Sequence, residues 1–198
     1  MDKFNGHVIV FDFDGVLAYN LQFYNGVITT LKNLYNNGLL ICLASFNYYA
    51  IDIIKFHGID YVFSAWRCGR SDLTPIKHSL DNETEDSYIT NNKIMTKADQ
   101  IVSMISELFN KNKIPEQEFP SIFTYPKIIF FDDDNGNIND AMNCFDLNCW
   151  AINVNPQYGI PKNIFKAIEY IVDYWETNPL VDKKKSNIYE SLNEIVND

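Results

Sequence analysis

Val8-Ile9-Val10-Phe11 runs directly into Asp12-Phe13-Asp14-Gly15-Val16 near the start of the chain. A short apolar run that is rich in β-branched residues and closed by glycine is typical of a buried strand ending in a loop. Asp12 and Asp14 then stand together at the end of a strand, where their negative charges repel each other. A bound cation removes that cost, and oxygen-only ligands suit Mg²⁺. One carboxylate could also act as a nucleophile and the other as a proton carrier, so this stretch predicts a reaction as well as a fold.

Strand and helix patterns alternate along the rest of the chain. The expected strands are His7–Phe11, Leu39–Ala44, Tyr61–Phe63, Lys127–Phe131 and Cys149–Val154. The expected helices are Leu21–Asn36, Asn47–Phe56, a segment capped by Thr96 that runs to Asn110, Ile138–Phe145, and one from Pro161 to about Thr177. The alternation predicts an α/β fold, with a three-layer, Rossmann-like, doubly wound parallel sheet and helices on both faces. Ligands in such sheets bind beyond the carboxyl ends of the strands.

The length of 198 residues fits one domain with a full core. We expect a single catalytic domain over residues 1–180 and a C-terminal tail over 181–198 that forms a short amphipathic helix. The polar stretch Arg67–Asn92 is interpreted as a long loop or small insertion, and no stretch is an obvious independent cap domain.

Composition narrows the class of protein. The 46% apolar and 15% aromatic content is typical of a globular chain. A formal net charge of −10 disfavours an electrostatic grip on nucleic acid. The N-terminal apolar run is too short for a secretory signal, and no stretch approaches the length that spans a bilayer. The four cysteines show no Cys-x-x-Cys spacing, so we expect reduced thiols in a cytoplasmic protein without membrane contact.

Further polar residues follow the other predicted strands. Ser45 comes directly after the second strand, Lys97 stands at a helix start, and Asp132 and Asp133 follow the strand Lys127–Phe131. Together with the first acid pair, the order along the chain is acid pair, hydroxyl, lysine, acid pair. All of these positions fall at the edge of the sheet where a ligand is expected.

This set resembles the haloacid dehalogenase (HAD) superfamily of phosphatases that use an aspartate nucleophile. The matching segments are VIVFDFDGVLA (Val8–Ala18), ICLASFN (Ile41–Asn47), the lysine near a helix start, and IIFFDDDNGNI (Ile128–Ile138). The resemblance covers about residues 7–155 and is strongest to the magnesium-dependent, capless branch, which acts on phosphotyrosine-type and other phosphomonoesters. It implies a HAD-like fold with no or minimal cap domain and an open site for phosphoproteins or other bulky phosphate esters.

The resemblance also implies a role for each residue. Asp12 would attack phosphorus and become an aspartyl-phosphate, and Asp14 would protonate the leaving oxygen and then activate water. Ser45, Phe46 and Lys97 would bind the phosphoryl oxygens. The Mg²⁺ set would be Asp12, Asp14 through its backbone carbonyl, Asp132 as a direct ligand and Asp133 through metal-bound water.

Several alternatives stay open at this level. Lys93 lies one helical turn before Lys97 and could take its place at the phosphate. Asp134 and Asn137 are interpreted as turn formers rather than ligand-shell residues. An EF-hand fails, because Gly136 at its sixth position would put Phe131 and Met142 where acids are required.

The function has rivals too. The chain could be a non-catalytic HAD-like binding protein, which would not need a nucleophile plus an acid. Removal of a nucleic-acid 3′-phosphate is a further alternative. The sequence does not identify the substrate, which could be a phosphorylated small molecule or a phosphoprotein, and it does not determine the oligomeric state.

Overall fold

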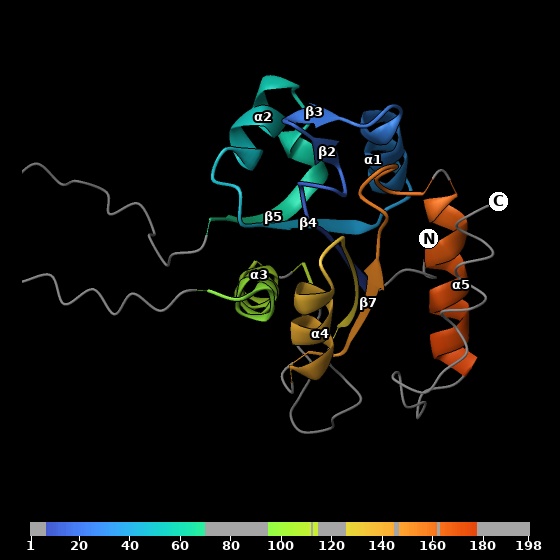
Figure 1. The fold of residues 1–198 in the computed structure, drawn as a ribbon. Coiled ribbons are helices and arrows are strands. Elements are labelled where there is room, and N and C mark those ends of the chain that lie inside the picture. Colours follow the sequence, from blue (N-terminus) through green and yellow to red (C-terminus); the bar gives the residue numbers. More distant parts are fainter. Residues whose placement is uncertain are drawn as a thin grey trace, which may run out of the picture.

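The structure is a computed structural model that describes residues 7–69, 95–111, 113–114, 126–144, 147–161 and 163–177 (Figure 1). The tail expected over 181–198 and most of the polar stretch Arg67–Asn92 therefore lie outside the described residues.

A five-stranded parallel sheet forms the centre of the molecule, with strand order β5-β4-β1-β6-β7. Its strands are β1 (His7–Phe11), β4 (Leu40–Ser45), β5 (Phe63–Cys68), β6 (Lys127–Asp132) and β7 (Cys149–Asn153). β1 occupies the middle of the sheet, where Val10 pairs with Cys42 of β4 on one side and with Phe130 of β6 on the other. The predicted α/β, Rossmann-like parallel sheet is confirmed.

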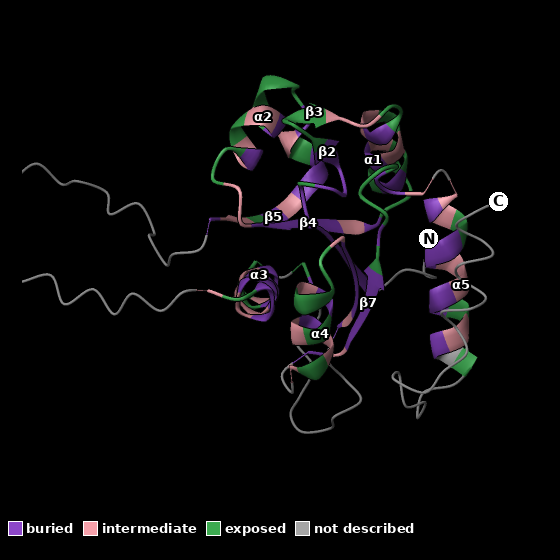
Figure 2. Ribbon diagram, viewed as in Figure 1, coloured by how far each residue is buried: buried purple, intermediate pink, exposed green. Residues whose placement is uncertain are grey.

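Helices cover both faces of this sheet (Figure 1). The buried residues of α1 (Val27–Asn36), α2 (Ala50–Phe56) and α5 (Ile164–Thr177) share one core cluster, whereas those of α3 (Lys97–Asn110) and α4 (Asn135–Asn143) share the other. Because water is excluded from both faces, the central strands contain almost only apolar residues. β1 is buried along its whole length. Figure 2 shows that β4 and β7 are also mostly buried.

The segment between β1 and α1 differs from the sequence-based expectation. A helix was expected from Leu21, but α1 begins at Val27. The preceding residues instead form a small antiparallel hairpin of β2 (Ala18–Tyr19) and β3 (Gln22–Phe23). Its turn residues Asn20 and Leu21 have positive φ angles of 49° and 64°, a conformation that ends any helix. Between β1 and α1, a segment that is described throughout, this hairpin is the only secondary structure.

The third strand also differs from the expectation. The predicted strand Tyr61–Phe63 coincides largely with a 3₁₀ turn, Asp60–Val62, and β5 follows it over Phe63–Cys68. The loop expected from Arg67 was therefore wrong at its first residues. β5 is an edge strand, and Arg67 fits there because its guanidinium pairs with Glu107 of α3 at 2.7 Å.

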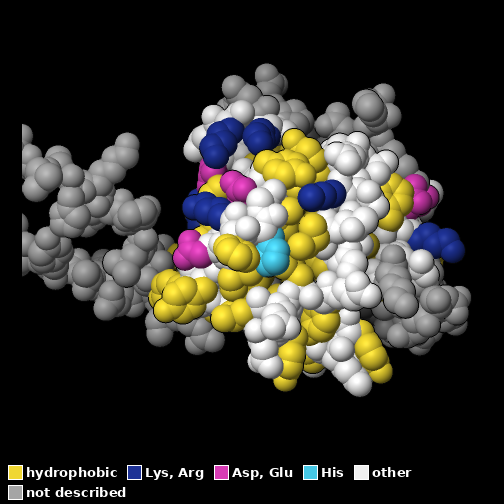
Figure 3. Space-filling model, turned by 90° about the horizontal axis from the view of Figure 1, so that it is seen from above, with side chains coloured by type: hydrophobic (Ala, Val, Ile, Leu, Met, Phe, Trp, Pro, Cys, Tyr) yellow, Lys and Arg dark blue, Asp and Glu magenta, His cyan; other side chains and the backbone are white. Residues whose placement is uncertain are grey.

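The surface carries several exposed apolar side chains. Figure 3 shows the face seen from above, where hydrophobic side chains surround a histidine. Phe56 is 87% exposed next to His57, and Tyr49, in the turn before α2, is 67% exposed.

No described helix has the length and apolarity to cross a membrane. The four cysteines, all within the described residues, form no disulfide, and Cys42 and Cys149 are buried.

Candidate active site

The carboxyl ends of β1 and β6 bring three predicted acids together. The β1–β6 register pairs Phe11 with Phe131, so the next residues, Asp12 and Asp132, lie side by side. Asp12, Asp132 and Asp133 each offer a carboxylate oxygen, and these oxygens all lie within 4.8 Å of one another. Residues more than a hundred positions apart thus form one acidic cluster, because adjacent parallel strands end at the same edge.

Lys97 supplies the positive charge of this cluster. Its Nζ lies 2.8 Å from Asp12 Oδ1 and 3.5 Å from Asp132 Oδ2, and it donates a hydrogen bond to the Ala44 carbonyl at 2.5 Å. The Lys97 side chain is 0% exposed, so its charge is screened little by solvent. Lys93, the alternative lysine, lies outside the described residues.

The start of α3 positions this lysine. Thr96 is the N-cap: its hydroxyl accepts a hydrogen bond from the Asp99 N–H, and the Asp99 carboxylate accepts one from the Thr96 N–H. This reciprocal capping box satisfies backbone donors that an α-helix leaves unpaired. It also fixes where the first helical residue, Lys97, leaves the backbone.

The pKa values in the cluster are shifted by burial and by neighbouring charges. Desolvation raises the pKa of Asp12 to about 6, with the Lys97 ammonium opposing the shift and Asp132 adding to it. Burial also raises the pKa of Asp132, against Lys97 and a hydrogen bond from Asn137. The pKa of Asp133 is raised by burial and then by the charge of Asp12. One ammonium does not offset three clustered carboxyl groups, and a bound cation would lower all three pKa values.

Hydrogen bonds orient the Asp132 carboxylate. Its Oδ1 accepts from the Asp134 N–H at 2.8 Å, and the Asn137 amide donates to both oxygens at 3.0 and 3.1 Å. Asp134 itself caps α4, accepting from the N–H groups of Gly136 and Asn137, as expected of a turn former. Asn137 was expected to be a turn former as well, and that expectation was wrong for its side chain. The side chain reaches back to Asp132 because the first turn of α4 starts directly after β6.

Asp14 lies beside the cluster rather than within it. Its exposed carboxylate accepts hydrogen bonds from the Asn47 amide at 3.0 and 3.3 Å. The backbone at Gly15 passes very close to the Asp133 side chain. Gly15 has φ +73°, and a Cβ there would lie 2.3 Å from Asp133 Oδ2. Glycine is required at that position for both reasons.

Ser45 and Phe46, at the end of β4, line the same cavity as the acids. Ser45 is fully buried at the end of β4, and its Oγ accepts a hydrogen bond from the Asn47 N–H at 3.1 Å. It does not cap α2, whose N-cap is Tyr49. The ring of Phe46 lies 4.6 Å from Lys97 Nζ, so one aromatic face covers the buried ammonium.

These residues border one cavity of about 430 Å³. Its lining includes the predicted site residues Asp12, Asp14, Ser45, Phe46 and Asp133, and it adds groups that the sequence reasoning did not select: Gly15, Tyr19, Asn20, Asp134, Asn137 and Pro156. Tyr19 belongs to the hairpin and is 61% exposed, so the hairpin forms part of the rim. The sequence signal for Asn47 was its place at the end of the ICLASFN segment, but its contact with Asp14 depends on the tertiary structure.

The acidic cluster fits a hard divalent cation. Its ligands are carboxylate oxygens, and this chemistry matches Mg²⁺ rather than a thiolate-binding metal. The Asp14 side chain is not among the three clustered carboxylates, which is compatible with the expectation that Asp14 would contribute through its backbone.

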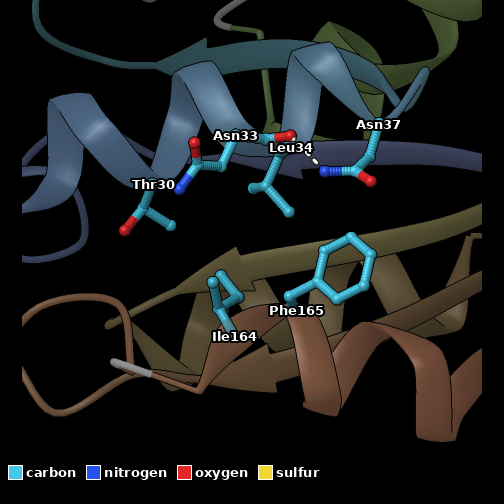
Figure 4. A pocket seen from close by; sticks show the side chains of 6 residues that line it. All are labelled: Thr30, Asn33, Leu34, Asn37, Ile164 and Phe165. Atoms are coloured by element: carbon cyan, nitrogen blue, oxygen red, sulfur yellow. Dashed lines mark hydrogen bonds between the residues drawn. The ribbon is translucent and has the colours of Figure 1, made fainter.

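A second hollow of about 290 Å³ lies between α1 and α5 (Figure 4). It is lined by Thr30, Asn33, Leu34, Asn37, Ile164 and Phe165. None of these side chains is titratable, and the Asn37 amide is held by the Asn33 carbonyl at 2.7 Å. This second hollow therefore offers no titratable side chain, in contrast to the first cavity, whose lining includes Asp12, Asp14 and Asp133.

No protein-family model and no curated protein matches this sequence. Among solved structures, the chain is similar to a HAD-superfamily hydrolase from Ehrlichia chaffeensis, with 18% identity and a TM-score of 0.43 over 79% of this chain. The chain spans 60% of the length of that protein. It is also similar to a protein from Clostridium difficile described as a "putative phosphatase", with 14% identity and a TM-score of 0.47, over 78% of this chain and 87% of that one.

Proposed function

We propose that the protein is a Mg²⁺-dependent phosphomonoester hydrolase that works through an aspartyl-phosphate at Asp12. The observation that carries the proposal is the cluster of Asp12, Asp132 and Asp133 beside the buried Lys97 ammonium, with Asp12 and Asp133 lining a cavity. A cation-binding acidic cluster and a fixed ammonium are the parts that phosphoryl transfer needs, because its transition state spreads negative charge over the phosphoryl oxygens.

Asp12 is the proposed nucleophile. Its carboxylate borders the cavity, while Lys97 and the Phe13 N–H, at 2.6 Å, hold its Oδ1. The other oxygen would attack phosphorus, form the phosphoenzyme and release the leaving-group oxygen. Bound Mg²⁺ would supply charge neutralisation for the phosphoryl oxygens and for the acidic cluster.

Asp14 is the proposed general acid and base. It is exposed in the cavity, and the Asn47 amide orients its carboxyl group. Asp14 would give a proton to the leaving oxygen and then take one from the water that hydrolyses the aspartyl-phosphate. Ser45 and Phe46, which line the same cavity, would bind phosphoryl oxygens, and the Lys97 ammonium would balance their charge.

The cavity supports a substrate with a bulky leaving group. Its rim includes the exposed Tyr19 ring, and the hairpin is the only element that the structure places between β1 and α1. A site without a lid on this side admits large phosphate esters, including phosphoproteins, and gains less from excluding water.

The test is an assay of p-nitrophenyl phosphate and a panel of phosphate esters with Mg²⁺ and with EDTA. We expect hydrolysis that requires Mg²⁺, with a decrease of at least about a thousandfold in Asp12→Asn, since a carboxamide cannot form the phosphoenzyme. Asp52→Asn is the matched control, because Asp52 is exposed in the first turn of α2, away from the cavity lining.

Two results would contradict the proposal. One is equal rates with Mg²⁺ and with EDTA, and the other is an Asp12→Asn variant that keeps the parent activity. Mass spectrometry of the acid-quenched protein should find phosphate on the peptide that contains Asp12 in the parent and not in the variant.

A further inference from the structure

We propose that Gln100 is a positioning residue for the phosphate-binding wall of the cavity: by holding the Ser45 carbonyl, its amide sets the direction of the Phe46 N–H. The inference rests on the proposed function for its substrate but names a residue outside the reacting groups. Gln100 is fully buried on α3, one turn after Lys97.

Gln100 grips two strand ends at once. Its Nε2 donates to the Ser45 carbonyl at 3.1 Å and to the Gly69 carbonyl at 2.7 Å. The Gly69 N–H in turn donates to the Ser45 carbonyl at 2.9 Å. The last register pair of the β4–β5 ladder joins Ser45 to Cys68, so these three bonds continue the connection past the end of the ladder. They join Gln100, Ser45 and Gly69 in a ring at the place where β4 and β5 end.

Because the Ser45 carbonyl is held, the direction of the next backbone N–H, that of Phe46, is also set. The Ser45 carbonyl and the Phe46 N–H belong to one planar unit and point in opposite directions, so fixing the oxygen fixes the donor. The preceding carbonyl, that of Ala44, is held by Lys97 at 2.5 Å. Positions 97 and 100 lie on the same helix face, so α3 clamps the peptide units on both sides of Ser45.

The other end of the amide indicates why glutamine is used. Gln100 Oε1 has no hydrogen-bond partner among the described residues, although it is buried. An unpartnered buried carbonyl is unfavourable for folding, and a methionine would fill similar space without that cost. The reason for a glutamine at this position is therefore its N–H donor group, which bonds the Ser45 carbonyl.

The test compares Gln100→Met with the parent and with Ser103→Ala. Ser103 lies on the same helix and accepts a hydrogen bond from Arg67 of β5 at 3.0 Å, so its loss weakens the α3–β5 contact without touching Ser45. We expect Gln100→Met to raise the KM for p-nitrophenyl phosphate and the inhibition constant of inorganic phosphate together, by about 5- to 10-fold. The kcat should change by less than about threefold.

Thermal unfolding separates positioning from folding. Gln100→Met should melt within a few degrees of the parent, whereas Ser103→Ala should bind phosphate as the parent does. Unchanged phosphate inhibition in Gln100→Met would overturn the inference. The same rise in both variants would also overturn it, because the effect would then come from a loosened helix.

Direct binding of inorganic phosphate, measured by calorimetry with Mg²⁺ present, distinguishes this inference from the proposed function. If the parent binds phosphate without hydrolysing esters and Gln100→Met binds it more weakly, the proposed hydrolase is wrong and the positioning role is supported. If the parent hydrolyses esters and Gln100→Met equals it in phosphate binding, only the positioning role is wrong. If the parent neither binds phosphate nor hydrolyses esters, both are wrong.

Discussion

Asp12 shows how burial and charge compete at a single residue. Its place between two buried strands raises the pKa to about 6, even though the Lys97 ammonium lies 2.8 Å from its Oδ1. Because this folded-state pKa exceeds the ordinary value of 3.8, the metal-free protein loses stability from Asp12 as the pH rises from about 4 to about 6. Above that range the carboxylate is charged and ready for a cation. A bound cation would therefore stabilise the charged form of Asp12.

The affinity for Mg²⁺ should depend on pH for this reason. A carboxyl group that is protonated below pH 6 must lose its proton before it binds a cation. We expect the Mg²⁺ dissociation constant to rise by about tenfold for each pH unit below about 6, with proton release on binding. Calorimetry in two buffers with different ionisation enthalpies measures both quantities. A dissociation constant that stays constant between pH 5 and pH 8 would contradict this.

At the scale of the element, α3 carries more of the site than its length implies. Its first residue, Lys97, contacts two acids, and Gln100 contacts the ends of β4 and β5. The remaining buried residues on this face, Ala98, Ile101, Met104, Ile105 and Leu108, anchor the helix in one core cluster. The apolar stripe thus fixes the rotation of the helix, and this rotation points both polar side chains at the site.

Thr96→Ala should weaken both stability and activity. It removes the capping hydroxyl of α3, so we expect the free energy of unfolding to fall by about 1 kcal/mol. Hydrolysis should also slow, because Lys97 follows the cap directly. Urea unfolding gives the first quantity and p-nitrophenyl phosphate hydrolysis the second.

Ser106→Ala is the control on the same helix, since its hydroxyl donates to the Val102 carbonyl one turn earlier, away from the cap. Equal losses of stability in the two variants would show that the cap at Thr96 has no special role.

At the scale of the whole molecule, the site joins elements that pack into different cores. β1 and β6 contribute side chains to both core clusters, whereas α3 packs on one face and the hairpin packs with the other. An ion bound by Asp12 and Asp132 would cross-link two neighbouring strands in the centre of the sheet. Ligand binding at this point should therefore stabilise the whole fold against unfolding.

Mg²⁺ should therefore raise the melting temperature by mass action. At a concentration about a hundredfold above the dissociation constant, binding adds about 2.7 kcal/mol to stability. For a chain of this size we expect the melting temperature to rise by about 5–10 °C. Asp132→Asn should lose most of this shift, while Asp52→Asn, altered at an exposed position of α2, should keep it. A shift of the same size in Asp132→Asn would place the ion elsewhere.

The sequence was most informative where one segment carries its own pattern. The apolar run of β1, the capped helix after Thr96 and the strand Lys127–Phe131 agree with the structure because each depends on local periodicity and end signals. The pattern was misleading in the hairpin Ala18–Phe23, where two residues adopt positive φ angles in a turn. It was also misleading at β5, an edge strand that keeps polar side chains because one side of it faces outward.

What the residues alone determined is the parallel sheet and the positions of the acids, the hydroxyl and the lysine at its ligand-binding edge. Only the tertiary structure decided that Asn137 orients Asp132, that Asn47 holds Asp14, and that Gln100 holds the end of β4. Strand and helix patterns repeat over a few residues, so they can be recognised locally. A hydrogen bond between side chains dozens of positions apart depends on how whole elements are rotated and packed, which no local pattern records.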